Sequence, residues 1–72
     1  MKVFITFGQG HAHSVAGKTF DKDCVAVIEA DDEEDGRMTA FKYFGGKFCF
    51  SYTEDNWKEE NMSFFPRGYI YL

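Results

Sequence analysis

The chain has 72 residues, with nine Phe, four Tyr and one Trp against a single Leu, and its formal net charge is −4. This length predicts one domain, residues 1–72, and the aromatic content excludes a disordered chain. No apolar run approaches the length of a membrane span, and no signal-peptide pattern is present. We therefore expect a cytoplasmic protein without a membrane partner, in which Cys24 and Cys49 are buried free thiols.

The N-terminal third is predicted to form a strand over 2–7 followed by a long loop over 8–19. Val3, Ile5 and Phe7 alternate along the strand and define one apolar face. The glycines that follow interrupt this alternation. A connection of this length in so small a domain is typical of a binding or mobile segment.

A second strand over 23–30 and a helix over 31–44 are predicted next. The strand is apolar on both faces, as is typical of a central, covered strand. Asp31 and Glu34 have the spacing of a capping box at the start of the helix. Gly36 is a mild defect in the helix. The predicted apolar stripe consists of Met38, Phe41 and Phe44.

The C-terminal part is predicted to contain a strand over 47–53 and a short edge strand over 69–72. Between them, 54–65 is ambiguous and is compatible with a short helical turn in which Trp57 packs inward. A turn at Pro66 precedes the edge strand. The side chains predicted to share the core face of the 47–53 strand are Phe48, Phe50 and Tyr52.

These elements predict an α+β fold with a three- to four-stranded mixed sheet and one helix packed on one face, in the order β-β-α-β-β. The strands on either side of the helix are expected to be parallel, and the first and last strands are expected to pair antiparallel. One helix covers only one face of a sheet. The other face is therefore expected to expose a dimer or partner patch of Phe4, Val25 or Val27, and Tyr69 or Tyr71.

Acidic residues are concentrated in two segments of the sequence. The candidate binding residues in them are Glu33, Glu34, Glu54, Glu59 and Glu60. On one face they form a negative surface suited to a basic partner. The alternative is a solvated surface that keeps an aromatic-rich protein soluble. The shortage of clustered Lys and Arg argues against direct nucleic-acid binding.

The glycine-flanked loop contains His11 and His13, whose spacing lets two imidazoles reach one metal ion from an extended backbone. Asp23 is the candidate third ligand, beside Asp21 and Cys24. A metal or small-ligand site, a binding loop without metal, and histidines with only local hydrogen bonds remain open. Two ligands do not define a metal site, so no cofactor is predicted.

No catalytic motif accompanies the possible nucleophiles. Ser14 and the cysteines lack a nucleophile elbow or a catalytic-cysteine pattern. The glycine-containing segments match neither the dinucleotide fingerprint nor the P-loop spacing. We therefore expect a protein that is not an enzyme.

Five short elements occur in a recognisable order: Phe7-Gly8, His11-x-His13, a Val/Ile/Glu strand over 25–29, an acidic run over 31–35, and Phe44-Gly45. In this order the sequence resembles small uncharacterised proteins encoded by tailed bacteriophages, over residues 3–52. The resemblance implies a viral accessory protein that acts in the cytoplasm of an infected bacterium. It implies no particular activity.

The leading hypothesis is a non-catalytic phage accessory protein that binds a host protein, as an inhibitor or modulator. The acidic face and the loop with His11 and His13 are its candidate binding surfaces. One alternative is a metal- or small-ligand-binding protein organised by the two histidines. Another is a structural homodimer joined through the uncovered sheet face.

Overall fold

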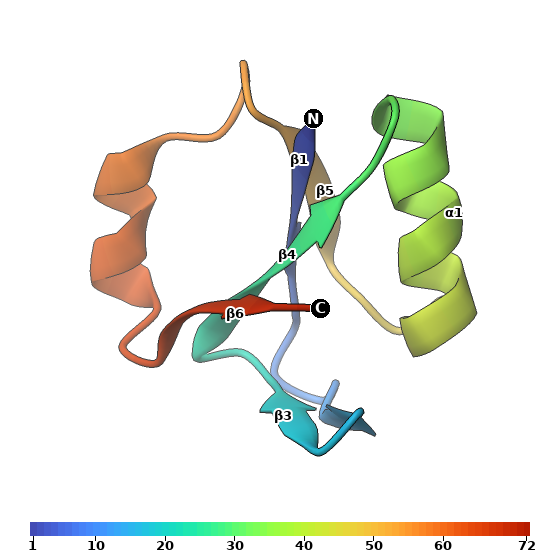
Figure 1. The fold of residues 1–72 in the computed structure, drawn as a ribbon. Coiled ribbons are helices and arrows are strands. Elements are labelled where there is room, and N and C mark those ends of the chain that lie inside the picture. The colour runs from blue at the N-terminus through green and yellow to red at the C-terminus, as the bar shows by residue number, and fades with distance from the viewer.

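The computed structural model describes residues 1–72 as a mixed four-stranded sheet with α1 on one face and a short 3-10 helix, η1, on the other (Figure 1). In chain order the elements are β1 (Lys2–Thr6), β2 (His13–Val15), β3 (Lys18–Phe20), β4 (Cys24–Glu29), α1 (Glu33–Phe44), β5 (Phe50–Thr53), η1 (Glu59–Phe64) and β6 (Gly68–Tyr71). The α+β prediction, with one sheet and one main helix, is confirmed. No helix has the length and apolar character needed to cross a bilayer.

The strand order in the sheet is β5-β1-β4-β6. β1 pairs antiparallel with both β4 and β5, as predicted for the first strand. The strands before and after α1 run in the same direction, as predicted, and β1 lies between them. The antiparallel prediction for the last strand is also wrong, because β6 pairs parallel with β4. The reason is that η1 carries the chain back across the sheet, so that β6 starts at the end where β4 starts (Figure 1).

The predicted loop over 8–19 is wrong in its second half, where β2 and β3 form an antiparallel hairpin. Its two-residue turn consists of Ala16 and Gly17, with φ angles of 53° and 77°. Positive φ at both positions is what a type I′ hairpin turn requires. The hairpin delivers Phe20 to the core, where its side chain is fully buried.

α1 begins one residue later than the predicted capping box. Asp32 is the N-cap, and its Oδ1 accepts a hydrogen bond of 2.8 Å from the Asp35 backbone N–H. Asp35 in turn accepts from the Asp31 N–H at 3.1 Å. The helix therefore has a side-chain N-cap at Asp32 and a second bond from Asp35 back to the residue before the cap, in place of the predicted capping box of Asp31 and Glu34.

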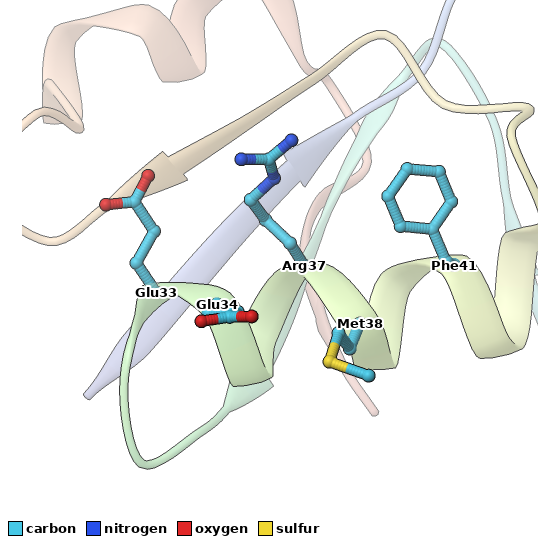
Figure 2. A pocket seen from close by; sticks show the side chains of 5 residues that line it. All are labelled: Glu33, Glu34, Arg37, Met38 and Phe41. Carbon is cyan, nitrogen blue, oxygen red and sulfur yellow. The ribbon is translucent and has the colours of Figure 1, made fainter.

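The face of α1 that packs on the sheet differs from the predicted stripe. Met38 and Phe41 are 65% and 51% exposed, and Figure 2 shows Phe41 on the β5 side of the helix and Met38 on the opposite side. The buried helical residues are Gly36, Ala40 and Phe44, four residues apart. A Cβ at position 36 would lie 2.9 Å from Val3 Cβ, so only glycine allows this approach. Gly36 is thus a packing residue and not a defect.

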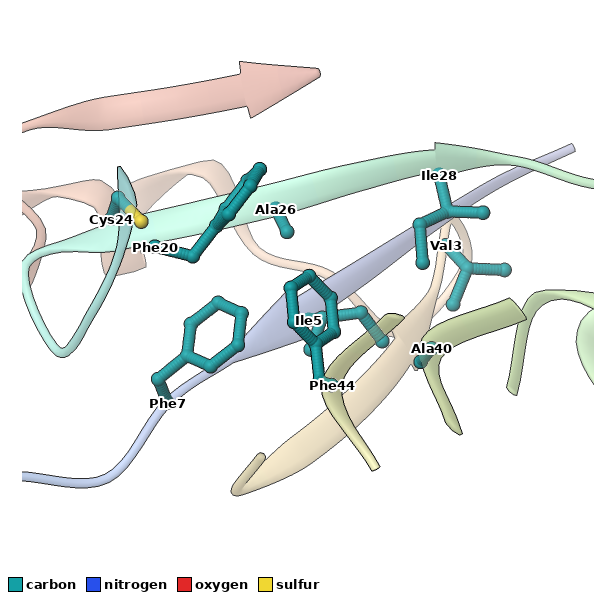
Figure 3. Packing of buried hydrophobic residues seen from close by; sticks show 9 residues of the cluster. All are labelled: Val3, Ile5, Phe7, Phe20, Cys24, Ala26, Ile28, Ala40 and Phe44. Atoms are coloured by element: carbon teal, nitrogen blue, oxygen red, sulfur yellow. The ribbon is translucent and has the colours of Figure 1, made fainter. Parts of the chain in front are cut away.

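The main core lies between α1, the hairpin and the sheet (Figure 3). Its buried residues are Val3, Ile5, Phe7, Phe20, Cys24, Ala26, Ile28, Ala40 and Phe44. The Phe44 ring meets the Phe7 and Phe20 rings edge-on, with centroids 4.9 and 5.3 Å apart. Large rings thus fill the space that aliphatic side chains fill in other small cores.

A second layer covers the other face of the sheet. Trp57 stacks on Phe4, with ring centroids 5.2 Å apart and planes 13° from parallel. Val25 and Val27 are buried, and Phe4 is half-buried. The predicted exposed patch is therefore wrong for these three residues, because the segment after β5 folds back over this face. Tyr71 shares the face and is 50% exposed, as predicted. The inward packing of Trp57 is confirmed.

The predicted core face of the fifth strand is split between the two layers. Phe48 lies just before β5 and packs against the main core. Tyr52 lies opposite Phe4 and Phe50 opposite Thr6, so both side chains point to the η1 side. Phe50 is 59% exposed, which contradicts its prediction as a core residue.

Candidate functional site

One end of the sheet is acidic. Lys2 of β1 pairs with Glu29 of β4, and its backbone N–H donates a hydrogen bond to the Glu54 carboxylate. The Met1 nitrogen lies beside them and donates to the Ala30 carbonyl at 2.6 Å. Glu29 and Glu54 therefore flank β1 at its first residues.

The first turn of α1 lies at the same end, because the chain passes from β4 to the helix in three residues. Glu33 and Glu34 are exposed there, next to the positive end of the helix dipole. We call Glu29, Glu33, Glu34 and Glu54 the acidic end. The ion pairs of the protein join Met1 to Glu29, Lys22 to Asp23 and Arg67 to Asp21. Glu33, Glu34 and Glu54 therefore keep their negative charge unpaired.

Glu59 and Glu60, the remaining acidic candidates, belong to η1 in the other layer. The Glu59 carboxylate accepts a hydrogen bond of 2.8 Å from the Tyr69 hydroxyl, which also accepts one of 2.9 Å from Trp57 Nε1. Burial, and then the hydrogen bond to Glu59, raise the pKa of Tyr69. Glu59 thus anchors η1 to β6, while Glu60 is exposed.

An open hollow of about 500 Å³ lies on the outer side of α1 and adjoins the acidic end. Its lining residues are Glu33, Glu34, Arg37, Met38 and Phe41 (Figure 2). Glu33, Arg37 and Phe41 project toward the β5 side of the helix. The Phe41 ring contacts Phe48 there, with centroids 5.2 Å apart. The spacing of four residues between these side chains was the available sequence signal for this surface.

An apolar groove of about 340 Å³ lies between β5 and η1. We call it the aromatic groove after its lining side chains Phe50, Tyr52, Trp57, Phe64 and Phe65. Phe64 is 75% exposed at its rim. Sequence periodicity missed the groove, since 54–65 carries neither a helical nor a strand repeat. The signal that remained was the excess of rings in this segment.

The two histidines of the predicted HxH site have separate environments. His13 Nε2 lies 2.7 Å from the Lys47 carbonyl oxygen, and its ring packs between Phe7 and Phe44. His11 Nδ1 is buried without a hydrogen-bond partner. No three His, Cys, Asp or Glu side chains come together in a group able to hold a metal, so Asp23 does not join the histidines as a third ligand. His13 instead fixes the segment that follows α1.

The two cysteines are free, as predicted, but only one is buried. Cys24 lies in the main core, and burial raises the pKa of its thiol. Cys49 is exposed and lines the aromatic groove, which contradicts its prediction as a buried thiol.

The surfaces of the protein therefore offer unpaired negative charge and exposed rings, which are the means by which proteins bind other macromolecules. The chain matches no protein-family model, and no similar curated protein or solved structure was found. Its function has to be inferred from its own residues.

Proposed function

We propose that the protein is a non-catalytic binding module that engages a basic host protein through its acidic end. The observation that carries the proposal is the gathering of Glu33, Glu34 and Glu54 at one end of the sheet, without an ion pair inside the protein. Such a surface attracts a positively charged partner over roughly a Debye length, about 8 Å at physiological salt. The action in a phage-infected bacterial cytoplasm rests on the resemblance over residues 3–52.

The predicted binding residues divide into two groups in this proposal. Glu33, Glu34 and Glu54 contact the partner, because their carboxylates are exposed or only weakly engaged. Glu59 serves mainly to hold η1, and the His11–His13 loop supports the segment after α1 through the His13–Lys47 contact. Glu60 is exposed on η1, outside the acidic end, and also does not contact the partner.

The test captures proteins from a bacterial lysate on the immobilised protein at about 0.05 M and about 0.5 M NaCl, where screening differs strongly. The wild type is expected to retain basic proteins at low salt and release them at high salt. The double variant Glu33→Gln/Glu34→Gln removes two charges from the acidic end and is expected to retain much less of the same proteins.

A matched control is the double variant Asp23→Asn/Glu60→Gln, which removes as much charge away from the acidic end. It is expected to capture like the wild type. Equal losses in both variants would mean that net charge alone drives retention. Capture that ignores salt and both variants would contradict the proposal.

A further inference from the structure

The two edges of the sheet are protected unequally. At the β6 edge, Lys18 Nζ donates to the Tyr71 carbonyl oxygen at 2.5 Å, and Arg67 donates to the Thr19 carbonyl at 3.0 Å. These side-chain contacts tie β6 to the β2–β3 hairpin. At the other edge, nothing pairs with the outer side of β5. Its sequence, Phe-Ser-Tyr-Thr, has neither the charge nor the proline that normally blocks an open edge.

The two faces of β5 differ in what lies beside them. Phe50 and Tyr52 point to the η1 side, where they line the aromatic groove. Ser51 lies opposite Ile5 and points to the α1 side. On that side Glu33, Arg37 and Phe41 project from α1 toward β5 (Figure 2). An open strand edge thus has an apolar groove on one face and charged and aromatic side chains of α1 beside the other.

We propose that the outer edge of β5 receives an extended segment of the partner protein as an additional strand. Main-chain N–H and C=O groups that point outward from an edge strand are matched by another extended polypeptide. Side chains of an added strand alternate between faces. One set enters the aromatic groove, and the other set faces the side chains of Glu33, Arg37 and Phe41 on α1.

Charge selects which polypeptide fits. The Thr53 end of β5 lies next to Val3, Glu54 follows it, and Gly36 of the first half of α1 packs on the same Val3. The added strand therefore meets the acidic end there and an apolar region at the other end, where Phe41 contacts Phe48. A second copy of this chain, with net charge −4, is repelled, whereas a segment with aromatic and basic residues is attracted. The inference rests on the proposed function and specifies its partner as a basic, aromatic, extended segment.

The experiment uses the capped peptide Lys-Phe-Lys-Phe-Thr-Phe, whose Phe side chains share one face and whose Lys side chains share the other. Trp57 is the only tryptophan of the system and lines the groove, so its fluorescence reports binding directly. We expect saturable binding, and slowed amide hydrogen exchange in β5 but not in β6. A peptide of the same composition with its Phe residues adjacent is expected to bind about tenfold more weakly.

Methylation of the peptide backbone separates strand addition from simple adhesion to the groove. In an added strand, alternate residues point their N–H groups to the neighbouring strand. N-methylation of the Phe residues and N-methylation of the others must therefore have opposite effects, one abolishing binding and one tolerated. Equal effects of the two methylated peptides, or no binding of the parent peptide, would overturn the inference.

Two surface variants test the location without endangering the fold. Phe64→Ser removes an exposed ring of the groove and is expected to weaken peptide binding about tenfold, the loss typical of an interface anchor. Tyr71→Ser removes a half-exposed ring at the opposite sheet edge and is expected to leave binding unchanged. Equal losses in both variants would place the peptide elsewhere.

The two proposals fail in different ways. If the peptide does not add to β5, but capture from the lysate still depends on salt and on Glu33 and Glu34, only the proposal of strand addition is overturned. If Glu33→Gln/Glu34→Gln changes neither peptide binding nor capture from the lysate, the proposal that the acidic end contacts the partner is overturned. Sedimentation that shows a dimer abolished by Ser51→Lys would identify a second copy as the occupant of β5 and contradict the inference.

Discussion

Gly36 determines how closely α1 approaches the sheet, because its missing side chain leaves the space that Val3 occupies. Helix propensity alone favours Ala over Gly by about 1 kcal/mol. Packing acts in the opposite direction at this position, since overpacking a dense core costs roughly 1–3 kcal/mol. The local and the tertiary preference therefore conflict at one residue, and the contact geometry decides between them.

Gly36→Ala is expected to lower the free energy of unfolding by about 1 kcal/mol or more, because the clash exceeds the gain in propensity. In a Val3→Ala background, which removes the two Cγ contacts but keeps Cβ at 2.9 Å, the same change is expected to cost less than in the wild type. Urea unfolding followed by circular dichroism measures both. Gly46→Ala, at a position with no neighbour to clash with, is the control. Additive effects in the double variant would contradict this account.

The same residue shows why the buried helix face was predicted incorrectly. A search for apolar stripes selects Met38 and Phe41 and ignores glycine, although glycine at position 36 is what faces the sheet. The stripe prediction is correct for Phe44, which lies four residues after Ala40 and eight after Gly36 and so shares their face of the helix. Hydrophobicity thus predicts which side chains are able to be buried. How closely a helix approaches a sheet depends instead on the size of the side chains at the contact.

At the scale of elements, one group of hydrogen-bonded side chains holds η1 against the sheet. Trp57 Nε1 donates to the Tyr69 hydroxyl, and that hydroxyl donates to Glu59. The group joins the segment after β5 to β6, and Trp57 covers Phe4. This layer lacks a sequence repeat, so its position depends on a few specific contacts.

Tyr69→Phe is expected to lower the free energy of unfolding by about 1–3 kcal/mol near neutral pH, because Trp57 and Glu59 both lose their partner. The pKa of Tyr69 is raised in the folded protein, chiefly by burial. A raised pKa means that its contribution is complete below about pH 10 and is lost as the pH rises through the folded value. The difference in the free energy of unfolding between the wild type and Tyr69→Phe should therefore shrink at alkaline pH. Unfolding titrations at about pH 8 and above about pH 10 test this, and a constant difference would contradict it.

The elements with strong local signals were predictable, and those set by distant contacts were not. Alternation in β1 and the apolar run of β4 identified both strands, and the acidic run marked the start of α1. The hairpin turn at Ala16 lacks the Asn-Gly or Asp-Gly pair that announces such a turn. The direction of β6 depends on where η1 crosses the sheet, which no local pattern records. The aromatic groove depends on that same crossing.

At the scale of the whole molecule, negative charge is distributed unevenly. The acidic end carries unpaired carboxylates, whereas Asp21 at the other end of the sheet is paired with Arg67 at 3.0 Å. The Asp23 N–H and Arg67 lower the pKa of Asp21. Mutual repulsion at the acidic end opposes folding and is screened by salt. Under the proposed function, a positively charged partner would relieve this repulsion and stabilise the folded protein.

Raising NaCl from about 0.02 M to about 0.3 M is expected to raise the melting temperature, because the Debye length falls from roughly 20 Å to roughly 6 Å and the repulsion between the acidic side chains is screened. Glu33→Gln/Glu34→Gln is expected to show a smaller rise, and Asp23→Asn/Glu60→Gln a rise closer to that of the wild type. Differential scanning calorimetry measures the three responses. A melting temperature that falls with salt would show that attraction, and not repulsion, dominates the charge interactions.

The unequal edges of the sheet also bear on how copies of this protein aggregate. Fibrous growth by edge-to-edge pairing needs two open edges on every copy, so that each newcomer offers another place to add. Here Lys18 donates to a β6 carbonyl and Arg67 ties the start of β6 to the hairpin, whereas no such contact is made by the edge of β5. Two copies that pair through β5 use up the less protected edge of each. Further growth then has to use the β6 edge, where an added strand competes with the Lys18 contact.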